Sequence, residues 1–200
     1  MAKSVDPLAP GFLIASPPLG DPNFERTLVL LAMHGEEGAL GFVVNRAASM
    51  NLGELLTFAG YGDALPKDRS SVYVGGPVQP SSGWVIALDP GINADEGGVI
   101  AIGDRVRISS SRSALEALAK DLAAREPGTP DPKRRTVVLG YSGWGPGQLE
   151  SEIATGSWLP APFDEGVLFD VALSERWERA YALIGLHPAL TLSMRSVGEA

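Results

Sequence analysis

The segment 139–153, LGYSGWGPGQLESEI, has the residue types and order that are typical of a catalytic or ligand-binding turn. It combines a serine, a tyrosine and a tryptophan with several glycines, and it continues the apolar run 136–139. A strand that leads through a glycine-rich turn into a helix is how nucleophile elbows and nucleotide-binding loops begin. Two chemistries therefore have to be tested against this segment: nucleophilic attack by Ser142, and phosphate binding by backbone N–H groups.

Neither template matches in full. The nucleophile elbow needs Gly-x-Ser-x-Gly, but Trp144 stands at the last glycine. The dinucleotide fingerprint needs Gly-x-Gly-x-x-Gly, but Gly147 comes one position early and Pro146 removes a backbone N–H. Glu150 and Glu152 suit the positive end of a helix dipole and disfavour an anion there. We predict a tight strand-to-helix corner whose aromatic residues either pack in the core or present a binding surface.

Few other residues offer catalytic or metal chemistry. The chain has no cysteine and only two histidines, His34 and His187, and no H-x-x-x-H or clustered Asp/His pattern is present. A serine, histidine and acid trio can be drawn from Ser142 and His34, but no sequence pattern supports it. We therefore assign no catalytic residue, no metal site and no cofactor, and the sequence favours a protein that is not an enzyme.

The charge balance bears on possible partners. Sixteen Lys and Arg against 24 Asp and Glu give a net charge of −8, which disfavours direct nucleic-acid binding and anionic membranes. The only dense basic stretch, 133–135, is expected to be a solvated entry to a strand. No apolar run approaches the roughly 20 residues of a membrane span. Together with the lack of cysteine, this predicts a cytoplasmic protein.

Short apolar runs bounded by Gly, Pro, Asn and Asp predict strands through the first half of the chain. The connection 35–38, Gly-Glu-Glu-Gly, has the length and chemistry of an antiparallel hairpin. The predicted strands are 11–15, 27–34, 39–45, 72–75, 84–88, 99–102 and 105–109, with two more beginning at Thr136 and Gly166.

Capping residues and apolar spacing predict four helices. Asn51 followed by Glu54 has the form of an N-cap with its return partner, and Ser113 followed by Glu116 repeats it. The helices are expected from 52 onward, from 113 to before Pro127, from about Gly147 to Gly156, and from Ser174 to Gly185. Strands in hairpin order followed by interleaved helices predict an α+β fold. We expect a single domain over 11–188, with tails at 1–10 and 189–200.

Motifs spread along the chain resemble the YqgE/AlgH family of bacterial proteins. They are FLIASP (12–17) with DPNF (21–24), His34 with GALG (38–41) and VVNR (43–46), GGPV (75–78), and GYSGW (140–144) followed by GQLE (147–150) and Trp158. Their order and spacing agree over about residues 11–188. The resemblance implies a small barrel-like, mainly antiparallel β-sheet flanked by about four helices.

The resemblance implies no reaction, ligand or catalytic residue, although one family member is named as a regulator of alginate production. The chain also departs from the family pattern at three places. Ala47 replaces an expected proline, Ser142 stands where alanine is common, and the chain ends in Gly-Glu-Ala where Gly-His-Ala is usual.

The leading functional hypothesis is a non-enzymatic protein, a monomer or weak dimer, that binds a protein or small ligand, with an indirect regulatory role. The alternatives are an enzyme or nucleotide-binding protein built on the turn 142–148, and a DNA-binding transcriptional regulator. The candidate binding surface comprises His34, Asn45, Arg46, Tyr141, Ser142, Trp144, Gln148 and Trp158. Structural turns are expected at Gly75, Gly76 and Pro77 and at Gly143, Gly145 and Gly147.

Overall fold

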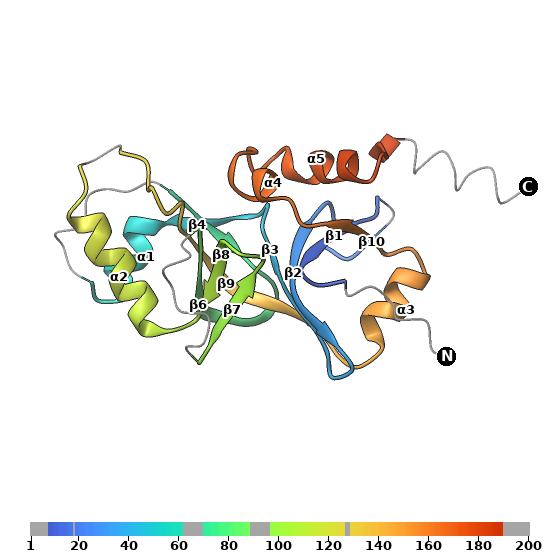
Figure 1. The fold of residues 1–200 in the computed structure, drawn as a ribbon, viewed down its shortest axis with the longest axis horizontal. Coiled ribbons are helices and arrows are strands. Elements are labelled where there is room, and N and C mark those ends of the chain that lie inside the picture. The colour runs from blue at the N-terminus through green and yellow to red at the C-terminus, as the bar shows by residue number, and fades with distance from the viewer. Residues whose placement is uncertain (1–7, 18, 62–69, 89–96, 127–128, 190–200) are drawn as a thin grey trace, which may run out of the picture. The chain divides into compact units, whose positions relative to one another are not determined.

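The computed structural model describes residues 8–17, 19–61, 70–88, 97–126 and 129–189 (Figure 1). Within these residues the chain forms ten strands and five helices, and the sheet is mainly antiparallel. The predicted α+β class is therefore confirmed, with five helices where about four were expected. The C-terminal Gly-Glu-Ala departure lies outside the described residues.

The chain divides into two compact units. The first unit comprises residues 1–45, 76–78 and 141–200, and the second comprises 46–75 and 79–140. Strands β6 and β9 contribute residues to both. The single domain 11–188 stays a prediction.

The first unit is built on strands in the order β10-β1-β2-β3-β9. Each neighbouring pair in this order is antiparallel. The strands are β1 (Gly11–Ala15), β2 (Leu28–Gly35), β3 (Gly38–Val43), the end of β9 (Thr136–Trp144) and β10 (Trp158–Pro162). The helices are α3 (Gln148–Ala154), α4 (Glu165–Phe169) and α5 (Arg176–Leu183).

Helices cover both faces of these strands, with α3 on the opposite side from α4 and α5 (Figure 1). Residues 28–32 of β2 are all buried, as expected for a strand that is covered on both faces. On one side Trp177 of α5 donates its indole N–H to the carbonyl oxygen of Ala15 at 2.9 Å. On the other, Leu149 of α3 packs with Leu13, Val29 and other residues of the sheet.

The second unit contains β4 (Ala47–Asn51), β5 (Ser71–Val74), β6 (Val78–Leu88), β7 (Val99–Ile102), β8 (Val106–Ser109) and the start of β9, with α1 (Leu52–Phe58) and α2 (Arg112–Ala123). β5 lies parallel to β9, whereas β8 is antiparallel to β6 and β7. A separate core joins both helices to the strands and includes Leu52, Leu56, Val85, Leu118, Leu122 and Val137.

Several predicted elements are confirmed. The strands 11–15 and 99–102 have the predicted bounds, and the hairpin forms with Gly35 paired to Gly38 across the turn residues Glu36 and Glu37. Asn51 and Glu54 form the predicted capping box at the start of α1. Helix α2 begins earlier than predicted, because the N-cap is Ser111 instead of Ser113, and its hydroxyl oxygen accepts the N–H of Ala114.

One predicted strand is wrong. Residues from Gly166 form α4 because the side chain of Asp164 accepts the N–H of Val167 at 2.8 Å and caps a helix there. Strands β4 and β10 were not predicted. β9 runs on to Trp144, so the strand-to-helix corner is reduced to Gly145, Pro146 and Gly147.

Among the described residues, no helix combines the length and apolar character needed to span a bilayer.

Candidate functional site

The corner after β9 places Trp144 directly before α3. Side chains alternate along a strand, so Ser142 and Trp144 are both buried while Gly143 between them is exposed. Gly147 then takes the left-handed backbone conformation, with φ of 72°, and begins the helix. The N–H of Gly145 donates to Oε1 of Gln148 at 3.1 Å, which ties the corner to the first turn of α3.

Three aromatic rings meet beside this corner. The ring centroids of Trp144 and Trp158 are 5.9 Å apart in an edge-to-face arrangement. Phe24 lies 6.4 Å from Trp144 and 5.3 Å from Trp158. These separations are in the range at which aromatic pairs attract each other. The cluster joins β9, the start of β10 and the loop before β2.

The carboxylate of Glu152 holds the two tryptophans. Its Oε2 accepts the indole N–H of Trp144 at 2.9 Å and that of Trp158 at 2.8 Å. Its Oε1 accepts an N–H of the side-chain amide of Gln148, with Nε2 at 2.8 Å. Gln148 lies one helical turn earlier on α3. A carboxylate has about four acceptor positions, of which these donors use three. The indole groups thus satisfy their polar N–H inside the core and are fixed in orientation.

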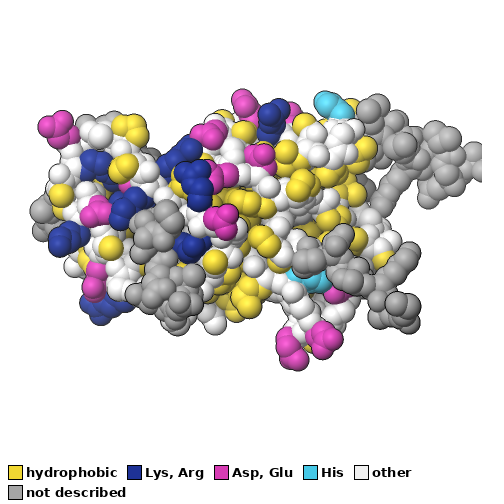
Figure 2. All heavy atoms as spheres, in the orientation of Figure 1, with side chains coloured by type: hydrophobic (Ala, Val, Ile, Leu, Met, Phe, Trp, Pro, Cys, Tyr) yellow, Lys and Arg dark blue, Asp and Glu magenta, His cyan; other side chains and the backbone are white. Residues whose placement is uncertain are grey.

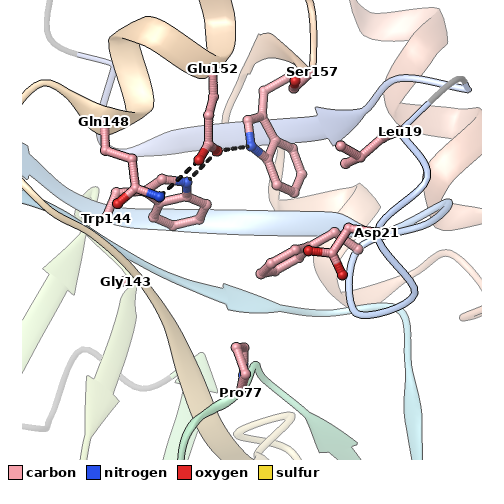
Figure 3. Close-up of a pocket in the computed structure, with 10 residues that line it drawn as sticks. Leu19, Asp21, Pro77, Gly143, Trp144, Gln148, Glu152 and Ser157 are labelled. Atoms are coloured by element: carbon pink, nitrogen blue, oxygen red, sulfur yellow. Dashed lines mark hydrogen bonds between the residues drawn. The ribbon is translucent and has the colours of Figure 1, made fainter.

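A pocket of about 290 Å³ opens beside this cluster (Figure 3). Glu152 and Gln148 point from α3 toward Trp144, and Pro77 lies on the opposite side of the pocket (Figure 3). The wall is aromatic, and its polar groups, counted over the part of the chain that the structure describes, include two carboxylates and no basic side chain. The lining residues are Leu19, Asp21, Phe24, Pro77, Gly143, Trp144, Gln148, Glu152, Ser157 and Trp158.

Asp21 and Phe24 reach the pocket from a hydrogen-bonded turn. Oδ1 of Asp21 accepts the N–H of Asn23 at 2.8 Å, and the carbonyl oxygen of Asp21 accepts the N–H of Phe24 at 2.9 Å. The hydroxyl of Thr27 donates to the carbonyl oxygen of Phe24 at 2.8 Å. Such side-chain bonds to the backbone fix a turn without regular secondary structure.

His34 contacts the neighbouring helix but does not line the pocket. Its Nε2 lies 2.8 Å from Oε1 of Glu150, and its side chain is 14% exposed. The pKa of the Glu150 carboxyl lies below its ordinary value because its own backbone N–H and then the His34 imidazole hydrogen-bond to it. The pair links the β2–β3 hairpin to the first turn of α3.

Ser142 is completely buried. A Cβ added at Gly76 would lie 2.5 Å from its hydroxyl oxygen and 2.4 Å from the carbonyl oxygen of Tyr141, so Gly76 lets the backbone approach β9 closely. An attacking serine has to reach its substrate, and Ser142 is enclosed. The nucleophile reading of the glycine-rich segment therefore fails on geometry.

The structure does not bring the rest of the predicted surface to the pocket. Asn45 accepts the N–H of Leu28 and donates to the carbonyl oxygen of Arg26, so both ends of its amide are used in the fold. It also lies six residues along the chain from Ala39, the partner of Trp144, which is roughly 20 Å in an extended strand.

Arg46 and Tyr141 have no place in the pocket lining either. Arg46 belongs to the second unit, where its carbonyl oxygen accepts the N–H of Val74 at 2.9 Å. Tyr141 is half-buried, with its ring next to Gly143 on β9. Trp144, Gln148 and Trp158 are thus the predicted surface residues that the structure brings together.

The basic stretch 133–135 is solvated only in part, because Arg135 is buried while the side chain of Lys133 is 44% exposed. The side chain of Arg135 is only 5% exposed and contacts Asp131 at 2.8 Å and Asp121 at 2.9 Å. Lys133 lies 3.8 Å from the same Asp121. Arg135 is buried because two acids that precede it in the chain, Asp121 by 14 residues and Asp131 by four, accept hydrogen bonds from its guanidinium group.

The predicted surface did not include Leu19, Asp21, Phe24, Glu152 and Ser157, and Pro77 and Gly143, which were predicted only as structural turns, also line the pocket. Glu152 had a usable signal, since it stands four residues after Gln148 on a predicted helix. Asp21 and Phe24 belong to the DPNF motif but lie more than a hundred residues from Trp144 in sequence, so only tertiary structure brings them to the site.

Comparison with known proteins relates nearly the whole chain to one family. Residues 12–189 match the family described as AlgH-like (DUF179). A UPF0301 protein from Anaeromyxobacter sp. strain K is 43% identical over 190 residues, covering 91% of this chain and 90% of the relative. A UPF0301 protein from Xanthomonas campestris pv. campestris strain B100 is 41% identical over 181 residues, covering 90% of each chain.

Solved structures agree with this. The solution structure of the AlgH protein from Pseudomonas aeruginosa matches with a TM-score of 0.72 and 36% identity, covering 96% of each chain. A crystal structure of a protein from Corynebacterium diphtheriae has a TM-score of 0.66 at 19% identity, with 96% of this chain and 94% of that chain covered, and shows a shared fold. The chain is an α+β protein of the AlgH-like family, as the sequence motifs predicted.

Proposed function

We propose that this chain is a non-enzymatic binding protein, acting in the cytoplasm, whose first unit takes a small ligand or a side chain of a protein partner into the pocket beside Glu152. The observation that carries the proposal is the carboxylate of Glu152, which two indole N–H groups bind at 2.9 and 2.8 Å. This arrangement holds aromatic surface rigid at the wall of an open pocket. Ligand sites commonly combine apolar and aromatic walls with a few fixed polar groups.

The same geometry disfavours the enzymatic and nucleotide-binding alternatives. Ser142 is enclosed, and none of the described residues that line the pocket is a lysine or arginine that could bind phosphate. Gln148 and Glu152 face the pocket from α3, and the carboxylate of Glu152 repels an anion.

A regulatory role, as the AlgH name suggests, would then be indirect. The protein would respond to a ligand or partner instead of contacting DNA. Lys133 and Arg135 of the basic stretch are engaged with Asp121 and Asp131 in the second unit, which is a poor arrangement for phosphate contacts.

The experiment is a fragment screen against the ¹⁵N-labelled protein, with cationic, neutral and anionic compounds in equal number. The indole N–H signals of Trp144 and Trp158 report directly on the pocket. Trp84, in the second unit, and Trp177, whose N–H donates to Ala15, serve as internal controls. We expect some compounds to shift the first pair and leave the controls unchanged. A screen in which no compound moves Trp144 or Trp158 would contradict the proposal.

A further inference from the structure

The net negative charge of the chain is concentrated in the unit that carries the pocket. The residue ranges of the first unit contain 5 Lys and Arg against 13 Asp and Glu, whereas those of the second contain 11 of each. The whole net charge of −8 therefore falls on the first unit. Figure 2 shows the Lys and Arg side chains concentrated over the elements of the second unit.

Two of the basic residues of the first unit, Arg26 and Arg176, are engaged away from the pocket. Arg26 contacts Glu178 at 3.4 Å and lies 4.5 Å above the ring centroid of Trp177. Arg176 is buried and donates to the carbonyl oxygens of Val44 and Val171. Among the residues that the structure describes, no Lys or Arg lines the pocket to neutralise Asp21 or Glu152.

The pocket itself offers what an organic cation requires. Glu152 has acceptor capacity left beyond its three donors, and Asp21 is exposed with one oxygen engaged in its turn. The half-buried ring of Phe24 and the indole of Trp144 supply aromatic electron density, which attracts ammonium and guanidinium groups. A volume of about 290 Å³ lies at the lower end of the sizes of ligand sites, roughly 300–1,000 Å³.

We propose that the ligand of this pocket is a small organic cation, an alkylammonium or guanidinium group, held between the carboxylates of Asp21 and Glu152 and the aromatic wall. This proposal rests on the proposed binding function and names its ligand class. The same chemistry is offered by a free amine and by a lysine or arginine side chain of a protein partner.

The test titrates the full chain with four probes of similar size: n-butylammonium, n-butylguanidinium, n-butylurea and butyrate. Binding is followed through the indole N–H signals of Trp144 and Trp158 at low and high salt. The two cations should bind at least about tenfold more tightly than the neutral urea or the anion, and added salt should weaken them. Equal or tighter binding of n-butylurea or butyrate would overturn the cation proposal while leaving the pocket as a ligand site.

Charge-neutral variants test which carboxylates act. Asp21→Asn keeps an acceptor for the Asn23 N–H, and Glu152→Gln keeps an oxygen for the two indoles. Each should weaken the cations about fivefold, whereas Glu175→Gln, an exposed acid of the same unit outside the pocket lining, should not. Equal weakening by all three variants would show only a general charge effect and overturn the site. Unchanged indole signals of Trp84 and Trp177 in the free variants verify that they are folded, because neither indole donates to Glu152.

A second arm separates the two sources of the cation. The peptide Gly-Gly-Lys-Gly-Gly with blocked ends is compared with its ε-acetyl-lysine form and with n-butylammonium. Tighter binding of the lysine peptide than of the free amine supports a protein partner, and equal binding supports a small amine. Binding of the acetylated peptide as tight as that of the lysine form would contradict the proposal.

Discussion

The indole N–H of Trp158 donates to Oε2 of Glu152 at 2.8 Å. Trp144 donates to the same oxygen at 2.9 Å, so one carboxylate orients two rings that come from different strands, β9 and β10. Both rings are almost completely buried, at 6% and 2% exposure. The pocket wall therefore depends on a single acidic residue of α3.

Replacing Glu152 by Ala should strongly destabilise the protein. The change leaves two buried indole donors without an acceptor, and an unsatisfied buried group costs about 1–3 kcal/mol. We expect the free energy of unfolding, measured by urea denaturation, to fall by about 3 kcal/mol. Glu152→Gln retains an acceptor oxygen and should cost clearly less. Equal losses for the two variants would indicate that the charge, and not the hydrogen bonding, stabilises the cluster.

The contact between His34 and Glu150 predicts that the Glu150 carboxyl titrates at a lower pH than an ordinary glutamate. The pKa of Glu150 is lowered chiefly by its own backbone N–H and then by His34. The folded-state pKa lies below the unfolded value of about 4.3, so the stabilisation is present above that pH and is lost as the pH falls through the folded value.

In the variant His34→Ala the pKa of Glu150, followed by NMR of the side-chain carboxyl carbon, should rise part of the way toward its ordinary value. The backbone hydrogen bond remains and keeps the rise incomplete. His187→Ala, which removes the other histidine, is the matched control and should leave it unchanged. An unaltered Glu150 titration in His34→Ala would show that the 2.8 Å contact has no electrostatic effect.

The capping box of the second unit gives a separate stability prediction. Oδ1 of Asn51 accepts the N–H of Glu54 at 3.0 Å, and Oε2 of Glu54 accepts the N–H of Asn51 at 2.9 Å. Asn51→Ala should lower the free energy of unfolding by about 1 kcal/mol in urea denaturation, because a helix N–H loses its acceptor. Asn51→Asp should retain most of the stability. A loss as large for Asp as for Ala would mean that the cap is not the cause.

Buried Arg176 should not tolerate lysine. Its guanidinium donates to the carbonyl oxygen of Val44 at 2.5 Å and to that of Val171 at 3.0 Å. A lysine ammonium is a single point and does not span both acceptors, so Arg176→Lys should cost about 2–3 kcal/mol in urea denaturation. The exposed Arg179→Lys should change stability by less than about 0.5 kcal/mol. Similar small effects for both variants would contradict this role of Arg176.

The sequence predicted the α+β class, the β2–β3 hairpin and the α1 cap, because each depends on residues close together in the chain. It failed where neighbours in space decide the structure. Residues 166–169 form a short apolar run, which periodicity alone does not assign to helix or strand. Pro160 and Pro162 argue against a strand, yet β10 lies at the end of its strand order, where proline is tolerated.

The candidate site was only partly predictable, because it too depends on neighbours in space as well as on residues close together in the chain. Gly140 and Gly143 are poor strand residues, so the segment resembled a loop, but pairing with β3 continues β9 through it. Trp144, Gln148 and Trp158 could be selected from their types and positions. Their grouping with Phe24 and Asp21, and their separation from Asn45, depend on strand pairing and on a turn that single residues do not reveal.

The decisive measurement is where a bound organic cation lies, because the proposed function requires it in the pocket beside Glu152. Intermolecular nuclear Overhauser effects between n-butylammonium and the ¹³C-labelled protein identify the contacting side chains. We predict contacts from the methylene protons to Phe24, Trp144 and Leu19, all of which line the pocket, and none to Trp84 of the second unit. The proposed site would be contradicted by contacts confined to residues outside the pocket lining, with no Overhauser effect to Phe24 or Trp144 at saturating ligand.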